Sequence, residues 1–307
     1  SGLAKRLDSI GISNAVIGIS GGLDSTLALI VTYEAFKKLG LSTSGILGIT
    51  MPGFGTTKRT YGNSVNICKQ MGISFKEIDI KKSCLQHFED IGHDPKIHDI
   101  TYENVQARER TQILMDIANK NGGLVIGTGD LSELEIGWCT YNGDHMSMYG
   151  VNCSIPKTLV KYLIEWYATD IRSENIELSN TLLDIIDTPI SPELLPSDGK
   201  EVTQKTEDTV GKYELIDFFI YNMERKRFDG EKIVFLAYNA FDGKYSQEEI
   251  MYRWNDFIRR HSRNQFKRNC LPDGPKVGTV SVSPRGDKRM SADVDLSIWQ
   301  VFQKFYK

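Results

Sequence analysis

The stretch from Asn14 to Leu29, NAVIGISGGLDSTLAL, constrains the fold more than any other part of the chain. Its first half, Ala15 to Ile19, is typical of a buried strand, and from Leu23 onward apolar residues recur at helical spacing. The segment between them, Ser20 to Ser25, holds two adjacent glycines. These let the chain turn tightly and leave backbone N–H groups at a helix N-terminus facing an anion. The stretch therefore predicts a phosphate-binding turn between a strand and a helix.

The residues of this turn indicate which kind of phosphate site it is. Neither a Walker A pattern nor a dinucleotide fingerprint occurs in the 307 residues. In place of a lysine the turn carries Asp24, which would repel a triphosphate unless a divalent cation lay between them, so Asp24 implies Mg²⁺. The SGGLDS segment resembles the SGGxDS loop of the ATP pyrophosphatases, which cut ATP between its α- and β-phosphates. The alternative is a Gly-Gly turn in which Asp24 only favours the helix N-terminus.

Strand and helix patterns alternate through the first half of the chain. We expect strands at 15–19, 45–50, 74–80 and 123–128, with helices at 24–39, 58–71, 82–91 and from an N-cap at Thr101 to Asn119. This alternation predicts a doubly wound α/β fold, Rossmann-like, with a parallel sheet flanked by helices. Ligands of such sheets lie at the carboxyl ends of the strands, where residues 20–25, 51–57 and 127–130 would gather. A mainly helical C-terminal extension follows, with helices expected at 213–224, 233–240 and 247–263.

Composition narrows the functional class. The net charge of −3 argues against a general nucleic-acid binder. The five cysteines show no zinc spacing, and their odd number does not suggest a disulfide framework, so a cytoplasmic location is expected. No apolar run approaches the roughly 20 residues of a membrane span, so no membrane partner is expected.

A second oxygen-rich corner is expected after the strand at 123–128. Thr128, Asp130 and Glu133 follow this strand, and Glu133 is a candidate to complete the Mg²⁺ shell begun by Asp24. The alternative is that Asp130 and Ser132 cap a helix with Glu133 in its first turn, and both interpretations can hold together.

The segment 137–154 is long, glycine-punctuated and rich in aromatic residues, which predicts a functional loop folded over a ligand. Trp138 and Tyr141 are candidates to stack on a flat ring, although both also suit a core. Asn104 and Arg108 are four residues apart and share a helix face, which is either a binding face or a solvated one.

Basic side chains suggest phosphate contacts at two places. Lys157 stands at the start of a helix, where its positive charge is unfavourable next to the positive end of the helix dipole. A bound phosphate would make a positive charge favourable there, so Lys157 is a candidate phosphate ligand. The alternative is an exposed lysine that points to water. The basic segment 259–268 suits a small polyphosphate ligand better than a nucleic acid in this slightly acidic chain. The polar stretch 197–211 is predicted to be a surface loop or lid.

Six stretches, taken together and in order, resemble NAD synthetase over nearly the whole chain: SGGLDS, NVQARER, GTGDLSELEIGWCTY, VNCSIPKTLV, NQFKR and SPRGDKRM. Residues 127–160 and 264–290 are more similar to the synthetase domain of the glutamine-dependent enzymes than to the ammonia-only ones. The chain departs from the family pattern at Asp287-Lys288 and in the charged segment 198–208.

The resemblance implies a two-step ligation. ATP adenylates the nicotinate carboxylate of deamido-NAD and releases pyrophosphate, and ammonia then displaces AMP to give NAD. Asp24 and Lys157 are implied as catalytic residues, and Asp24 and Glu133 as ligands of Mg²⁺. The implied ATP contacts are Gly18, Ile19, Ser20, Gly21, Gly22, Leu23, Asp24, Ser25, Thr128, Lys157 and Ser191. The implied deamido-NAD contacts are Asn104, Arg108, Glu133, Trp138, Tyr141 and Lys267.

The same resemblance implies partners and domain limits. Residues 1–270 are expected to form the synthetase domain and residues 271–307 its closing tail, and at least a homodimer is expected. Glutamine-dependent relatives carry an amidase domain, which we do not expect within these residues. Ammonia would then be free or supplied by a partner, or the chain is the synthetase part of a longer polypeptide.

Two rival functions fit parts of this sequence. Another ATP pyrophosphatase, such as a GMP synthetase or a tRNA-thiolating enzyme, shares the SGGxDS loop, but a thiolating enzyme would show catalytic or zinc-spaced cysteines and a basic surface. A non-catalytic nucleotide-binding module would leave Asp24 and Glu133 without a role.

Overall fold

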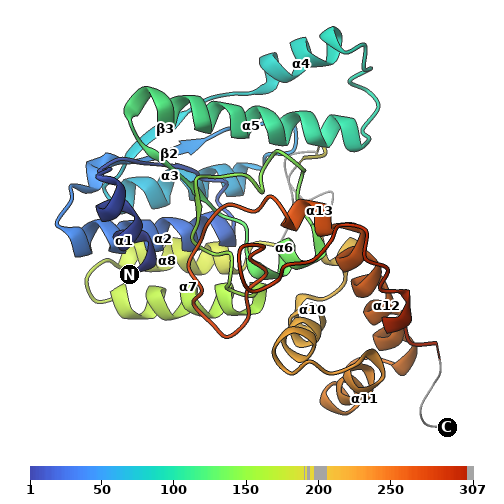
Figure 1. The fold of residues 1–307 in the computed structure, drawn as a ribbon. Helices are drawn as coiled ribbons and strands as arrows, with labels where there is room; N and C mark the ends of the chain where they lie inside the picture. Colours follow the sequence, from blue (N-terminus) through green and yellow to red (C-terminus); the bar gives the residue numbers. More distant parts are fainter. Residues whose placement is uncertain (190, 192–193, 197–205, 303–307) are drawn as a thin grey trace.

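A parallel sheet of five strands forms the centre of the N-terminal part, in the order β3-β2-β1-β4-β5 (Figure 1). The computed structural model describes residues 1–189, 191, 194–196 and 206–302. The strands are β1 (Ala15–Gly18), β2 (Ile46–Thr50), β3 (Ser74–Glu77), β4 (Leu124–Gly127) and β5 (Tyr149–Gly150). The inner strands β1, β2 and β4 are short apolar runs, as expected of parallel strands covered on both faces.

Helices cover both faces of this sheet. Along β1 the side chains alternate, so that Val16 packs with Ile49 and Val125 on one face and Ile17 packs with Ile46 and Ile126 on the other. On the first face lies α5 (Ile100–Asn121), against which α4 (Lys81–Asp90) packs, and on the second lie α2 (Leu23–Leu39) and α3 (Lys58–Gln70). Helices α1 (Gly2–Ile10), α7 (Lys157–Ile171) and α8 (Ile176–Ile186) pack against α2 and α3. The predicted doubly wound α/β fold is confirmed.

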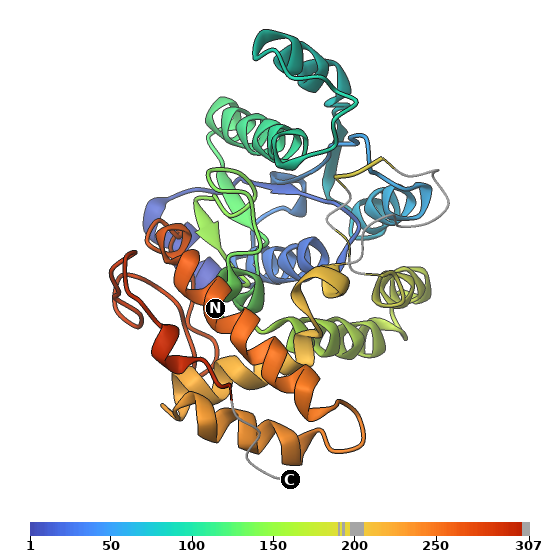
Figure 2. The same cartoon turned by 90° about the vertical axis from the view of Figure 1, so that its right-hand side faces the viewer.

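The C-terminal part is helical and has its own apolar cluster, centred on Phe219, Trp254 and Phe257. Its helices are α9 (Thr206–Val210), α10 (Tyr213–Ile220) with a π-helical turn at Tyr221–Arg225, α11 (Gly230–Ala240), α12 (Gln247–Arg263) and α13 (Gln265–Arg268). They lie together on one side of the sheet layer (Figure 2). The short α6 (Leu131–Ile136), which follows β4, packs its apolar side chains into this cluster. Helix α6 therefore connects the sheet to the helical extension.

The segment after Leu271 runs across this helical part. Val280, Val282 and Val301 are buried in its cluster, and the Trp254 indole N–H donates to the carbonyl of Trp299. The predicted domain limit at residue 270 stays a prediction.

Several predicted boundaries need correction. The helix expected from Thr101 begins at Ile100, because the carboxylate of Asp99 accepts hydrogen bonds from the N–H groups of Thr101 and Tyr102 at 2.9 and 3.0 Å. Strand β5 lies inside the segment predicted as a long loop, and its two residues are too few to show a strand pattern. Part of the predicted loop 197–211 is α9, while residues 197–205 lie outside the described set.

All five cysteines are free. Among the described residues no helix combines the length and the apolar character needed to cross a bilayer.

Candidate active site

The glycine turn after β1 is closed by its own hydrogen bonds. The backbone N–H of Gly22 donates to Ser20 Oγ at 3.2 Å, and Ser25 Oγ donates to the Gly22 carbonyl at 3.2 Å. Helix α2 begins directly after it at Leu23. The turn lies between β1 and β4, where the strand order reverses direction and open α/β sheets bind their ligands.

Gly21 is required at its position for two reasons. Its φ is +82°, a conformation that favours glycine, and a Cβ there would lie 2.0 Å from the carbonyl oxygen of Thr60. A Cβ on neighbouring Gly22 would meet Ser20 Oγ at an ordinary 3.5 Å. The close approach of two backbone segments therefore fixes the shape of the turn at Gly21.

We expect Gly21→Ala to lower the free energy of unfolding by about 1–3 kcal/mol from the backbone conformation alone, and to abolish ATP binding because the turn must shift. Gly62→Ala in α3, where an added Cβ would meet nothing within 4 Å, is the control and should retain both stability and binding. Thermal unfolding and calorimetric titration with ATP would measure the two effects. Equal behaviour of the two variants would contradict the role given to Gly21.

Three carboxylates converge on one lysine beside this turn. Asp24 lies in the first turn of α2, Asp130 precedes α6 and accepts a hydrogen bond from the N–H of Glu133, and Glu133 lies in the first turn of α6. Lys157 Nζ lies 2.5 Å from Asp24, 2.7 Å from Asp130 and 2.8 Å from Glu133. The side chain of Lys157 is only 2% exposed, so it is not the exposed lysine of the alternative interpretation.

Burial dominates the electrostatics of this group, which we call the carboxylate cluster (Asp24, Asp130 and Glu133). Burial raises the pKa of Asp130 well above its usual value and that of Glu133 to about 7, in both cases against the opposing effect of Lys157. Burial also disfavours the charge on Lys157, but the three carboxylates outweigh it and hold the pKa of Lys157 well above its usual value. The Lys157 amine therefore stays protonated and positively charged.

The carboxylate cluster fits a divalent cation. Its three residues each offer one oxygen, and these oxygens lie within 4.8 Å of one another. Asp24 Oδ1 is buried and accepts no hydrogen bond from the described residues. Carboxylate oxygens are the ligands that Mg²⁺ prefers. The structure thus brings together both predicted metal ligands, and it adds Asp130 to them.

Neighbouring polar side chains hold the cluster in place. The Asn152 amide donates to the carbonyls of Asp24 and Thr128 at 2.9 and 3.0 Å, which ties the two corners of the site together. Asp217, on α10, accepts hydrogen bonds from the N–H and the hydroxyl of Thr158 at 3.0 and 2.6 Å and from Ser132 Oγ. Burial raises the pKa of Asp217. The helical extension therefore fixes the start of the helix that carries Lys157.

The predicted deamido-NAD contacts gather along a neighbouring segment. Arg108 Nε donates to the Tyr141 carbonyl at 3.2 Å, and Asn104 accepts a hydrogen bond from the Thr140 hydroxyl at 2.8 Å. Lys267 Nζ donates to the carbonyls of residues 137 and 139 at 2.9 and 2.7 Å. The structure therefore places Asn104, Arg108 and Lys267 around one loop.

The two aromatic candidates differ in exposure. Tyr141 as a residue is 46% exposed, and its ring lies 5.4 Å from the Phe266 ring, so it is available to a ligand. Trp138 packs partly into the C-terminal apolar cluster, with the Arg260 guanidinium 5.9 Å from its ring centre. Ser191 is half-buried and has neighbours outside the described set, so its ATP contact stays a prediction.

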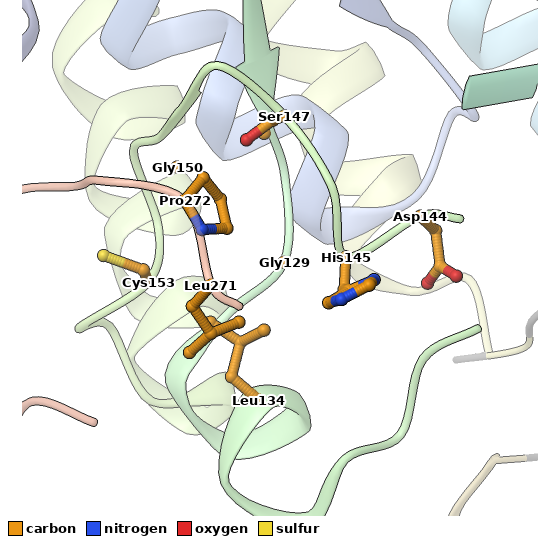
Figure 3. Close-up of a pocket in the computed structure, with 10 residues that line it drawn as sticks. Gly129, Leu134, Asp144, His145, Ser147, Gly150, Cys153, Leu271 and Pro272 are labelled. Carbon is orange, nitrogen blue, oxygen red and sulfur yellow. The ribbon is translucent and has the colours of Figure 1, made fainter. Parts of the chain in front are cut away.

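A small cavity lies under the loop that ends at β5 (Figure 3). Its volume is about 10 Å³, and Leu134, Cys153, Leu271 and Pro272 are among its lining residues. That volume suits a single water-sized molecule. The cavity is therefore too small for a nucleotide.

Most basic side chains of the segment 259–268 make internal contacts, and its binding of a small polyphosphate ligand stays a prediction. Arg268 is fully buried and donates to the carbonyls of Glu135 and His261. Both Arg259 and Arg260 pair with the carboxylate of Asp256. The spacing of charges in the sequence does not reveal these pairings.

Glu135 lies at the centre of this second buried group. His261 Nδ1 lies 2.7 Å and Lys288 Nζ 3.4 Å from its carboxylate, and Lys288 also pairs with Glu224. Burial alone would raise the pKa of Glu135, but Lys288, His261 and Arg268 hold it well below its usual value, while burial lowers that of His261 to about 4. Lys288, one of the departures from the family pattern, therefore has a structural partner.

Comparison with known proteins gives concordant results. The NAD synthase family profile matches residues 1–269. The glutamine-dependent NAD(+) synthetase of Mycobacterium leprae is 43% identical over 97% of this chain and 47% of its own length, so the chain spans about half the length of the curated relatives that it matches.

Solved structures agree in fold. A glutamine-dependent NAD(+) synthetase from Cytophaga hutchinsonii superposes with a TM-score of 0.76 at 18% identity, over 95% of this chain and 52% of that one. An NH3-dependent NAD synthetase from Campylobacter jejuni superposes with a TM-score of 0.59 at 20% identity, over 88% of this chain and 93% of that one. At these identities the similarity supports the fold.

Proposed function

Because the chain belongs to the NAD synthase family, we propose that it adenylates the nicotinate carboxylate of deamido-NAD with ATP, releasing pyrophosphate, and that ammonia then displaces AMP to give NAD. The observation that carries the proposal is the convergence of Asp24, Asp130 and Glu133 on Lys157 beside the glycine turn. A cation held by carboxylates next to a phosphate-binding turn suits a reaction on a triphosphate.

Each part of the site has a proposed task. The turn at residues 20–25 holds the β- and γ-phosphates, and Asp24 and Glu133, joined by Asp130, would hold Mg²⁺. Bound there, Mg²⁺ would neutralise phosphate charge. Thr128 and Lys157 contact ATP, and Lys157 stabilises the charge of the departing pyrophosphate. Because the carboxylate becomes reactive by adenylation, no protein nucleophile is needed, and catalysis comes from positioning and electrostatics.

The second substrate is proposed to bind along the loop that Lys267 and Arg108 hold. Asn104, Arg108, Trp138, Tyr141 and Lys267 would contact deamido-NAD, with the exposed ring of Tyr141 offering a stacking surface.

Ammonia is proposed as the immediate nucleophile. The curated relatives are named glutamine-dependent, so an amidase domain or partner is its proposed source. A homodimer and a cytoplasmic location stay predictions from the sequence.

A product assay tests the function. With Mg·ATP, deamido-NAD and ammonium, we expect AMP, pyrophosphate and NAD in equal amounts, and no AMP when deamido-NAD is omitted. Formation of ADP in place of AMP, or AMP formation with xanthosine monophosphate in place of deamido-NAD, would contradict the proposal. Replacing ammonium by glutamine in a parallel reaction would show whether these residues carry any amidase activity.

A further inference from the structure

We propose that the ammonium group of Lys157 occupies the position of the divalent cation in the nucleotide-free protein, so that metal enters the carboxylate cluster only when Lys157 leaves it. The proposal rests on the proposed function only in assigning the nucleotide's phosphates as the place to which Lys157 then moves.

The geometry of the cluster carries this inference. Lys157 Nζ is within 2.8 Å of an oxygen of each of the three carboxylates, and the same three side chains are the ones that could coordinate one metal ion. Mg²⁺ binds its oxygen ligands at about 2.0–2.1 Å. An ion in contact with the same three oxygens would press directly against the ammonium group, with no ligand between the two positive charges. The two cations therefore exclude each other.

The surroundings indicate how the exchange would proceed. The side chains of Asp24 and Glu133 are 24% and 19% exposed, whereas those of Asp130 and Lys157 are 0% and 2% exposed. The cluster thus meets solvent on the side of Asp24 and Glu133, where a hydrated ion would arrive. Lys157 contacts the cluster from its buried side, where the centre of the Tyr213 ring lies 5.3 Å from Lys157 Nζ.

The lysine side chain is suited to such a move. Its ammonium is a point charge on a flexible four-carbon stem, so it can exchange carboxylate partners for phosphate oxygens by rotation about its own bonds. The backbone N–H of Lys157 is fixed by Ser132 Oγ at 2.9 Å, so the start of α7 can stay in place while the side chain moves. A nucleotide would supply the negative charge that draws it out.

Manganese binding without nucleotide tests the inference. We expect Lys157→Met to bind Mn²⁺ at least ten times more tightly than the unaltered chain, measured by electron paramagnetic resonance of free Mn²⁺ in the absence of ATP. Mn²⁺ should also raise the Tm of this variant more than that of the unaltered chain. Lys161→Met, at an exposed position one turn further along α7, is the matched control and should bind Mn²⁺ as the unaltered chain does.

Two outcomes would overturn the inference. One is equal Mn²⁺ affinity of Lys157→Met and the unaltered chain. The other is a low-micromolar dissociation constant for Mn²⁺ on the unaltered chain in the absence of nucleotide. This second measurement uses no variant. Should Lys157→Met fail to fold, Lys157→Gln removes the charge, keeps a hydrogen-bond donor and leaves all three carboxylates in place, and it should show the same gain over the unaltered chain. No substrate enters these measurements, so their result is separate from that of the NAD synthesis assay.

Discussion

Asp24→Asn is expected to lower the rate of pyrophosphate release from Mg·ATP by about 10³-fold or more while the fold is retained. Removing a single electrostatic contact to the transition state typically costs about 10²–10³-fold, and the loss of a metal ligand removes the charge of the ion as well. The substitution keeps the size of the side chain, and the Asp24 backbone carbonyl still accepts the Asn152 hydrogen bond. Binding of the metal is therefore lost without a packing defect.

The control for this prediction is Asp116→Asn, at an exposed position on α5. Both variants should match the unaltered chain in circular dichroism, and only Asp24→Asn should lose pyrophosphate release. Near-normal release by Asp24→Asn would exclude the metal-binding role and, with it, the main chemical argument of the proposed function.

Arg268→Ala is expected to lower the free energy of unfolding by about 3–5 kcal/mol, the usual effect of breaking a buried ionic group by removing one partner. The guanidinium donates to the carbonyls of Glu135 and His261 and, through Nε, to Gln265 Oε1 at 3.0 Å. Its loss leaves these acceptors buried and weakens the positive field that keeps Glu135 ionised. Helix α6 then loses a main link to α12 and α13.

Arg263→Ala is the matched control, because Arg263 is exposed in the last turn of α12. Surface substitutions of this kind usually change stability by less than about 0.5 kcal/mol. Denaturant unfolding would measure both variants. Equal effects at the two positions would show that the buried contacts of Arg268 contribute little.

The sheet and the glycine turn could be predicted because their signals are local. Residues 15–19 are apolar without interruption, and the glycines follow directly, so neighbouring residues alone specify strand, turn and helix. The position of Glu133 near Asp24 followed from the rule that parallel strands end at one edge, and the structure places both beside Lys157.

Features that depend on distant parts of the chain could not be predicted. Asp217 is far from Thr158 in sequence, and no pattern relates them, yet it orients the helix of Lys157. The charge of Arg268 suggested a ligand site because sequence does not show which arginine is buried. Asp130 was recognised as part of an oxygen-rich corner, but its direct contact with Lys157 depends on the packing of α6 against α7.

The position of α6 limits how the two halves of this protein can evolve. One side of these six residues carries Glu133 toward the carboxylate cluster, and Glu135 on the same helix is enclosed by His261, Arg268 and Lys288 from the far end of the chain. A chimera that joined the sheet of one relative to the helical half of another would misplace a proposed metal ligand unless α6 and its enclosing residues were exchanged together. Loss of turnover after truncating the tail would accordingly be no proof that the tail touches substrate.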